Sequence, residues 1–250
     1  NSVTATQNVA GTTSTDTENV ISTTTWSWSN NFDNAANPLE GAVLQHAFPP
    51  LGQNADFTLD TNVSTAEYVV NADAANGDNE LDLATRTTAQ TLNQVVMLQY
   101  REMATGADQR FQTFSMAMDV DFSDNMTRFF NMGLGTQYYA QLNTTYAVGN
   151  VADKTLIRIM QGATVIFSEE VSSSTLGTRG VDRVSFEVDA NGLATFKMIG
   201  GGASIVKTGT FTNWNSASMV NLVPEIKSSR GYGESWVDNV QINAIVKSNV

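Results

Sequence analysis

The sequence predicts an all-β protein, built as a sandwich of two antiparallel sheets with an extended segment at its N-terminus. No segment carries a sustained apolar period of 3.6 residues, so helices are not expected. At least twelve short segments alternate apolar and polar residues and are separated by turn residues, which is typical of two packed sheets. No internal linker is visible after residue 26, so we expect one domain over residues 26–250, preceded by a segment of residues 1–25.

The N-terminal segment is rich in small hydroxylated residues. Residues 1–25 contain 12 Ser or Thr and no aromatic residue, the composition of a solvated, extended chain. Extended stretches such as residues 20–25 can add to an open sheet edge as an extra strand. The segment is therefore expected either to wrap its own sandwich or to extend onto a neighbouring subunit.

The first half of the domain contains several short strand patterns. Alternation or β-branched enrichment predicts strands over residues 26–33, 42–48, 66–70, 81–85 and 95–101. A turn with Pro38 follows the first of them, the pair Pro49-Pro50 follows the second, and an acidic loop with an Asn-Gly turn spans residues 71–79.

The strand predicted over residues 111–122 has the clearest alternation. One face carries only apolar side chains and the other carries small or acidic ones, as expected for a sheet with one wet face. The apolar face holds Phe114, Met116, Met118, Val120 and Phe122, and the other holds Thr113, Ser115, Ala117, Asp119 and Asp121. Later strands are predicted over residues 128–134, 138–142, 155–161, 164–170, 184–188, 193–199, 204–211 and 223–227, with Asn191-Gly192 closing a hairpin.

The closing strand, residues 234–246, contains an unusual acidic residue. Alternation places Trp236, Val240 and Ile242 on one face and Val237, Asn239 and Gln241 on the other. Asp238 then falls on the apolar side, where its carboxylate needs a cation, an Arg or backbone N–H groups. This run resembles the closing strand of bacterial jelly-roll and concanavalin-like β-sandwiches. The resemblance implies a jelly-roll fold in which this strand pairs with the first one, residues 26–32.

Charge and composition exclude several classes of function. With 13 Lys and Arg against 25 Asp and Glu, the net charge is -12, which repels phosphate backbones and makes nucleic acid an improbable partner. No apolar run approaches 18 residues, so no membrane span is expected. Cys is absent, which excludes disulfides and thiolate metal sites. We interpret the chain, which begins at Asn1, as a mature secreted, extracellular protein.

Asp33 and Asp238 are candidate ligands for a structural calcium ion. The resemblance to carbohydrate-binding jelly rolls implies such an ion where the ends of the sandwich meet, and hard carboxylate oxygens suit calcium. The alternative is that Asp238 caps a turn or pairs with an Arg.

Five residues are candidates for binding a glycan, which proteins commonly hold by aromatic stacking and planar polar groups. One of Tyr138 and Tyr139 must face outward if their strand alternates. Trp214, between two Asn residues, is expected in a loop and outside the core. Arg230 and Tyr232 lie in a Gly-flanked loop. Each of these side chains has an alternative role in closing an end of the sandwich.

Signals for catalysis are weaker. Asp119 and Asp121 share one strand face, but the E-x-D-x-x-E pattern of retaining jelly-roll glucanases is absent, and outward carboxylates usually serve solvation. Residues 98–102 resemble the Arg-bearing strand of alginate-lyase-like enzymes. That resemblance implies candidate parts of a lyase among Tyr100, Tyr138, Tyr139, Arg101, Arg158 and Tyr232. The lone histidine, His46, is more often structural than catalytic.

Three functions therefore remain open. The first is a secreted, non-catalytic protein that binds an extracellular polysaccharide. The second is a structural subunit of an extracellular filament or virion, a homo-polymer assembled through its N-terminal strand. The third is a polysaccharide lyase that acts by β-elimination on a uronate polymer.

Overall fold

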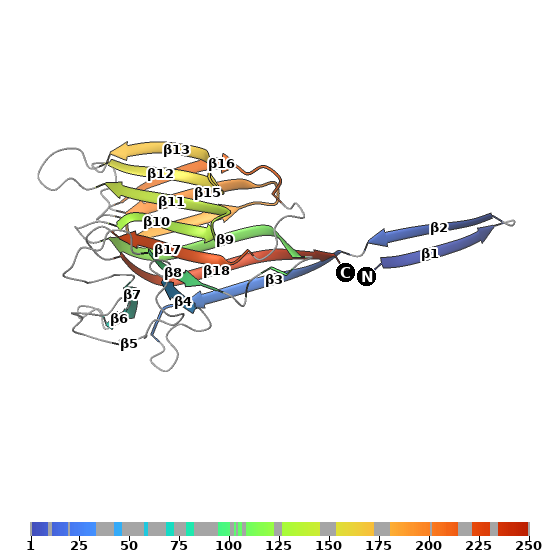
Figure 1. Ribbon diagram of the computed structural model, residues 1–250, viewed down its shortest axis with the longest axis horizontal. Helices are drawn as coiled ribbons and strands as arrows, with labels where there is room; N and C mark the ends of the chain where they lie inside the picture. The colour runs from blue at the N-terminus through green and yellow to red at the C-terminus, as the bar shows by residue number, and fades with distance from the viewer. Residues whose placement is uncertain are drawn as a thin grey trace, which may run out of the picture.

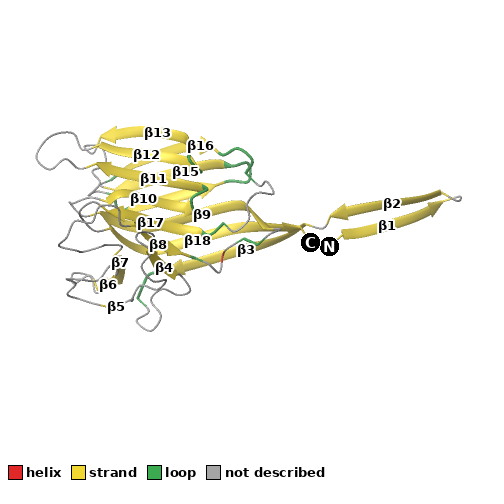
Figure 2. Ribbon diagram, viewed as in Figure 1, coloured by secondary structure: helices red, strands yellow, loops and turns green. Residues whose placement is uncertain are grey.

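The computed structural model contains three mainly antiparallel sheets, of two, seven and nine strands. Most of the described residues lie in these strands (Figures 1 and 2). It describes residues 2–9, 12–19, 21–33, 43–46, 58–59, 69–72, 79–82, 95–100, 103, 105–106, 109–122, 127–145, 154–172, 181–200, 202–214, 222–230 and 235–249. The two larger sheets pack face to face, which confirms the predicted all-β sandwich (Figure 1).

The nine-stranded sheet is built around two long central strands. Its order is β16-β15-β14-β9-β18-β7-β6-β5, and β3 also pairs with β18. The strands are β3 (Ile21–Asn30), β5 (Thr58–Leu59), β6 (Val69–Ala72), β7 (Asn79–Asp82), β9 (Gln109–Phe122), β14 (Arg183–Val188), β15 (Leu193–Gly200), β16 (Ala203–Thr210) and β18 (Ser235–Asn249).

The seven-stranded sheet has the order β13-β12-β11-β10-β17-β8-β4, with all neighbours antiparallel. The strands are β4 (Val43–His46), β8 (Val95–Gln99), β10 (Thr127–Leu134), β11 (Tyr138–Thr145), β12 (Lys154–Gln161), β13 (Thr164–Ser172) and β17 (Pro224–Arg230).

The core lies between these two sheets and is lined by alternate residues of their strands. On β9, Phe114, Met116, Met118 and Val120 are buried as predicted, and the residues between them are at least partly exposed. Aromatic rings pack edge to face within this layer, as with Phe114 and Phe186, whose centroids are 6.5 Å apart. Burial of this one continuous apolar cluster is the main force that holds the two sheets together.

The pairing of β18 with β3 confirms the predicted contact between the closing strand and the first strand of the domain. The ladder runs from the pair Val240–Asn30 to the pair Asn249–Ile21. Trp26 of β3 turns toward the core and packs edge to face on a buried phenylalanine at 5.7 Å. Because β3 begins at Ile21, part of the expected N-terminal segment pairs with its own sandwich.

A β-bulge interrupts β18 next to β9. Asp238 pairs with Asp119, and the next pair is Gln241 with Ala117, so two residues of β18 lie opposite one residue of β9. The first of the two, Asn239, has a φ of 47°. Asn adopts this left-handed conformation more readily than most residues with a side chain.

The bulge corrects the predicted faces of the closing strand. An extra residue reverses the inward–outward alternation, so Val237 and Val240 are both fully buried. Asp238, between Val237 and the bulge, is partly exposed. The prediction that Asp238 lies on the apolar face, with Val237 opposite it, was therefore wrong.

A separate hairpin precedes β3. Strands β1 (Ser2–Val9) and β2 (Thr12–Asn19) pair in register from Ser2–Asn19 to Val9–Thr12 and form the two-stranded sheet. In Figure 1 this hairpin projects past the ends of β3 and β18, away from the sandwich. Among the described strands, β1 and β2 pair only with each other.

Candidate functional site

The outer face of the seven-stranded sheet carries a row of polar side chains that contact each other across strands. Arg158 of β12, Gln141 of β11 and Asn131 of β10 occupy one cross-strand row that continues to Lys227 of β17. Arg158 Nη1 donates to Gln141 Oε1 at 3.4 Å, and Gln141 Nε2 donates to Asn131 Oδ1 at 3.1 Å. The alternation of each strand directs these side chains away from the core, and the hydrogen bonds limit their rotamers.

A second row lies beside the first. Tyr139 of β11 pairs with Gly133 of β10, which pairs with Glu225 of β17, which pairs with Gln99 of β8. Gly133 has a φ of 152°, and a Cβ there would lie 2.3 Å from the carbonyl oxygen of Tyr138. Only glycine fits at this point, so no side chain separates the Tyr139 phenol from the Glu225 carboxyl group within the row. We call the two rows together the Tyr139 face.

The charges of the Tyr139 face are mainly positive. Arg158 has no carboxylate partner among the described residues, and Lys227 Nζ lies 6.0 Å from the centroid of the Phe129 ring. Glu225 is 6% exposed and accepts a 2.6 Å hydrogen bond from Gln99 Nε2. Burial raises the pKa of Glu225, and the bond from Gln99 and the charge of Lys227 offset part of this rise.

The phenols of the lyase hypothesis have environments that disfavour a base. Burial raises the pKa of Tyr139, with an opposing effect of Arg158, and burial also raises the pKa of Tyr138. Tyr100 is 2% exposed, and burial raises its pKa well above the ordinary value. Because a general base must be deprotonated near the working pH, these shifts reduce the fraction of each phenol that could act.

Two of the predicted ligand-binding residues lie in the core. Tyr138 is 7% exposed and Trp214 is 8% exposed, and their rings meet edge to face at 5.1 Å. Trp214 Nε1 also donates to the backbone carbonyl of Gln112 at 3.0 Å. The expectation that Trp214 lies outside the core was wrong, because its indole closes one end of the sandwich over Tyr138. The alternation of β11 is confirmed, since Tyr139 is the outward member of its pair.

The remaining predicted residues are only partly described. Arg230 ends β17 and its backbone pairs with Thr127, but its side chain lies outside the described residues. Tyr232 and Arg101 lie outside them altogether, and of His46 only the backbone pairing with Val96 is described. Ligand binding by Arg230 and Tyr232 stays a prediction.

Asp33 and Asp238 each have a local hydrogen-bond partner. Asn31 Nδ2 donates to Asp33 Oδ2 at 2.6 Å, and Asn239 Nδ2 donates to Asp238 Oδ2 at 2.9 Å. Within the part of the chain that the structure describes, no three His, Cys, Asp or Glu side chains are grouped as a metal site requires. The side chains of Asp33 and Asp238 alone do not supply enough oxygen ligands for a calcium ion. Calcium binding by these two residues therefore stays a prediction.

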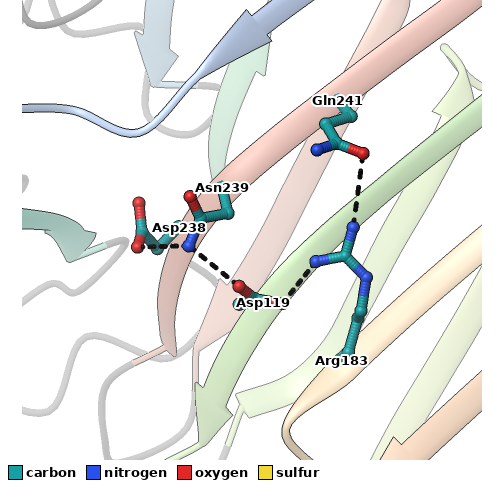
Figure 3. A network of polar contacts seen from close by, with 5 residues as sticks. All are labelled: Asp119, Arg183, Asp238, Asn239 and Gln241. Atoms are coloured by element: carbon teal, nitrogen blue, oxygen red, sulfur yellow. Dashed lines mark hydrogen bonds and ion pairs between the residues drawn. The ribbon is translucent and has the colours of Figure 1, made fainter.

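Asp119, one of the two carboxylates weighed for catalysis, belongs to a polar network (Figure 3). Arg183 Nη1 of β14 forms an ion pair with Asp119 Oδ1, and Asn239 Nδ2 donates to Asp119 Oδ2 at 2.9 Å. Arg183 Nη2 reaches Gln241 Oε1 at 3.4 Å. Both oxygens of Asp119 are thus occupied by structural contacts that join three strands around the bulge, whereas Asp121 is exposed beside them.

Sequence reasoning missed most of the Tyr139 face. Gln141, Asn131, Glu225 and Gln99 lie on four strands, and only the strand order brings them together. The available signal was weak: each is an outward polar position of an alternating strand, as many other residues are. Arg158 was considered only as part of a lyase.

Comparisons with known proteins identify the fold. No protein-family model matches the chain, and no curated protein matches it in sequence. The lectin of Bauhinia forficata, solved with GalNAc, superposes with a TM-score of 0.56 at 8% identity, over 90% of this chain and 99% of the lectin. Peanut lectin gives 0.53 at 11% identity, covering 88% and 97% of the two chains. Arcelin-5 of Phaseolus vulgaris, a lectin-like defence protein, gives 0.52 at 8%, covering 88% and 98%.

These similarities extend over nearly the whole length of each chain, while the identities are too low to carry more than the fold. Among the described residues, no helix has the length and apolar character that a membrane crossing needs. The chain has the fold of a concanavalin-like, jelly-roll β-sandwich.

Proposed function

We propose that this chain is a secreted, non-catalytic protein that binds an extracellular polysaccharide on the Tyr139 face. The observation that carries the proposal is the combination of a partly exposed phenol, Tyr139, with hydrogen-bonded side-chain amides and Arg158, which has no carboxylate partner among the described residues. Sugar rings stack on aromatic faces, and fixed planar polar groups orient their hydroxyls. The lectin-like fold of the solved neighbours supports the glycan class.

The charges of the face narrow the ligand to a neutral or acidic glycan. Arg158 and Lys227 attract carboxylates or sulfates, and the raised pKa of Glu225 weakens its repulsion of an acidic sugar. We place no reaction on the Tyr139 face, because burial raises the pKa of Tyr139. We place none at Asp119 on the other sheet, because its carboxylate is held in the network of Figure 3.

Calorimetric titration against a panel of neutral and uronate polysaccharides tests this proposal. For the best ligand, Tyr139→Ala should weaken binding by about 2- to 12-fold, from the roughly 0.5–1.5 kcal/mol of an aromatic contact. The matched control, Tyr139→Phe, keeps the ring and should retain most of the affinity. Binding that is unchanged in Tyr139→Ala would refute the site, and a rise in ultraviolet absorbance with a uronate polymer would instead support the lyase.

One observation favours a second function, assembly into a filament or shell. The hairpin β1–β2 projects from the sandwich and pairs with no third strand among those described (Figure 1). A two-stranded hairpin is marginally stable by itself in water, so a neighbouring copy of the chain would stabilise it by adding a strand. Deletion of residues 1–20, followed by light scattering and negative-stain imaging, tests this idea. Loss of polymers with an intact sandwich supports assembly, and an unchanged particle size opposes it.

A further inference from the structure

A groove of about 460 Å³ crosses the outer face of the nine-stranded sheet, on the side of the sandwich opposite the Tyr139 face. Five strands contribute to it: β3, β18, β9, β14 and β15. Short side chains on the central strand β9, Thr113 and Ser115, form its floor. Longer side chains on the flanking strands, among them Glu187, Asn243 and Ile245, form its walls.

One cross-strand row gives the groove its direction. Asn243 of β18 pairs with Ser115 of β9, Ser115 with Glu187 of β14, and Glu187 with Thr195 of β15. Three steps between neighbouring strands, each about 4.8 Å, make this row about 14 Å long. The row therefore presents polar groups in a line perpendicular to the strands, which suits an extended chain of repeating polar units.

The carboxylate of Glu187 is the one acidic group in this row and is exposed. No hydrogen bond or ion pair involves it in the described part of the chain. The second carboxylate of the lining, Asp189, already accepts hydrogen bonds from the backbone N–H groups of Asn191 and Leu193 through Oδ1. Of the two carboxylates in the lining, Glu187 is thus the one that no described residue occupies with a hydrogen bond or an ion pair.

The rest of the lining is neutral. Asn243 Oδ1 accepts a 2.9 Å hydrogen bond from Ser27 Oγ, which leaves the amide N–H groups for a ligand. Leu193 is 42% exposed and gives one wall an apolar surface. No Lys or Arg is among the described lining residues. The closest cation by register is Lys197, diagonal to Glu187 because its partner on β14 is Ser185.

We propose that this groove binds a glycan that carries free amino groups, such as a chain of hexosamine units. An ammonium group complements Glu187, the amide of Asn243 and the hydroxyls of the floor match sugar hydroxyls, and Leu193 packs on the C–H face of a ring. The net charge of -12 raises the local concentration of such a cationic ligand. The site is separate from the Tyr139 face, whose charges favour the opposite class of glycan.

Titration of the full chain with a glucosamine hexamer, its fully N-acetylated counterpart and a neutral glucose hexamer tests the proposal. The glucosamine hexamer should bind most tightly, and Glu187→Gln should weaken it by about tenfold or more, as expected for loss of a charge-assisted hydrogen bond. Asp121→Asn is the matched control, because Asp121 is an exposed carboxylate on the same face that does not line the groove. Asp121→Asn and Tyr139→Ala should both leave this affinity unchanged.

Three outcomes would overturn the proposal. Equal losses in Glu187→Gln and Asp121→Asn would mean that long-range attraction to an acidic protein explains the binding. Oligolysine that binds as tightly as the glucosamine hexamer, and that also depends on Glu187, would identify a peptide site in place of a glycan site. Loss of binding in Tyr139→Ala alone would show that the glucosamine hexamer binds on the Tyr139 face and not in the groove.

Discussion

Asn239 offers a direct test of how the bulge in β18 is stabilised. Its side-chain amide donates to Asp119 Oδ2 and to Asp238 Oδ2, both at 2.9 Å, while its backbone holds a φ of 47°. Asn239→Gly removes the two hydrogen bonds but tolerates the backbone conformation. Asn239→Ala removes the same bonds and also places a Cβ in the left-handed region, so comparing the two variants isolates the backbone term.

The size of each effect follows from exposure. Asn239 is exposed, so its two hydrogen bonds to carboxylates contribute about 1 kcal/mol together, less than buried ones. Glycine adds a loss of up to about 1 kcal/mol through the entropy of the unfolded chain. Alanine instead adds about 1–2 kcal/mol for the left-handed backbone. We expect the free energy of unfolding to fall by about 1–2 kcal/mol in Asn239→Gly and by about 2–3 kcal/mol in Asn239→Ala.

Equilibrium unfolding in urea measures both values, provided that the slope of the transition is unchanged. Gln241→Ala serves as a control, because Gln241 is exposed on the same strand and its side chain makes only the 3.4 Å contact with Arg183 among the described residues. It should change stability by less than about 0.5 kcal/mol. An alanine variant as stable as the glycine variant, or more stable, would show that the bulge does not require a left-handed residue here.

Three further predictions concern buried and acidic groups. The Tyr100 hydroxyl is buried with no hydrogen-bond partner among the described residues, so Tyr100→Phe should raise the free energy of unfolding by about 1 kcal/mol in urea unfolding; a decrease would show that the hydroxyl is satisfied. Because burial raises the pKa of Glu225 above its unfolded value, its carboxyl group favours folding at low pH, and this contribution is lost as pH rises through the folded pKa. The free energy of unfolding of Glu225→Gln should therefore increase relative to that of the wild type as pH rises above about 4.5. A difference between the two proteins that becomes smaller as pH rises would contradict this. If Asp33 and Asp238 hold calcium, a chelator should lower the melting temperature of the wild type and not that of the double variant with Asn at both positions. Equal melting curves of the wild type with and without the chelator would show that these residues hold no calcium.

The alternation of a regular strand could be read from the sequence, and the interruption of that alternation could not. Residues 114–121 have their predicted buried and exposed faces because this part of β9 alternates with a period of two, whereas Phe111 is buried out of phase, where the pairing with β18 shifts register. In β18 the same rule failed between Val237 and Val240, where a bulge inserts one residue. At the bulge Asn239 donates to Asp119 of β9, which is paired with Arg183 of β14, so the contacts around the bulge involve residues outside the local pattern.

The candidate sites were predictable only in part for a related reason. Alternation within β11 showed that one of Tyr138 and Tyr139 faces outward, and the structure identifies Tyr139. Polar neighbours correctly predicted a loop position for Trp214, which lies in a turn, but they did not show that its indole is buried and that Nε1 donates to a backbone carbonyl. The cross-strand rows of both faces depend on strand order and register, and neither can be derived from the local residue pattern of a single sequence.

The sandwich separates the groups that stabilise it from the groups that we propose to bind glycans. The apolar residues of both sheets fill the space between them, whereas Tyr139 and Glu187 lie on opposite outer faces and contribute little to that core. Because the two residues share no partner in the described part of the chain, their effects on stability should be small and additive. Tyr139→Ala and Glu187→Gln should thus unfold at nearly the wild-type urea concentration, singly and together. A loss of binding in either variant then reports on its own face, so the neutral or acidic ligand and the amine-bearing ligand can be assigned independently.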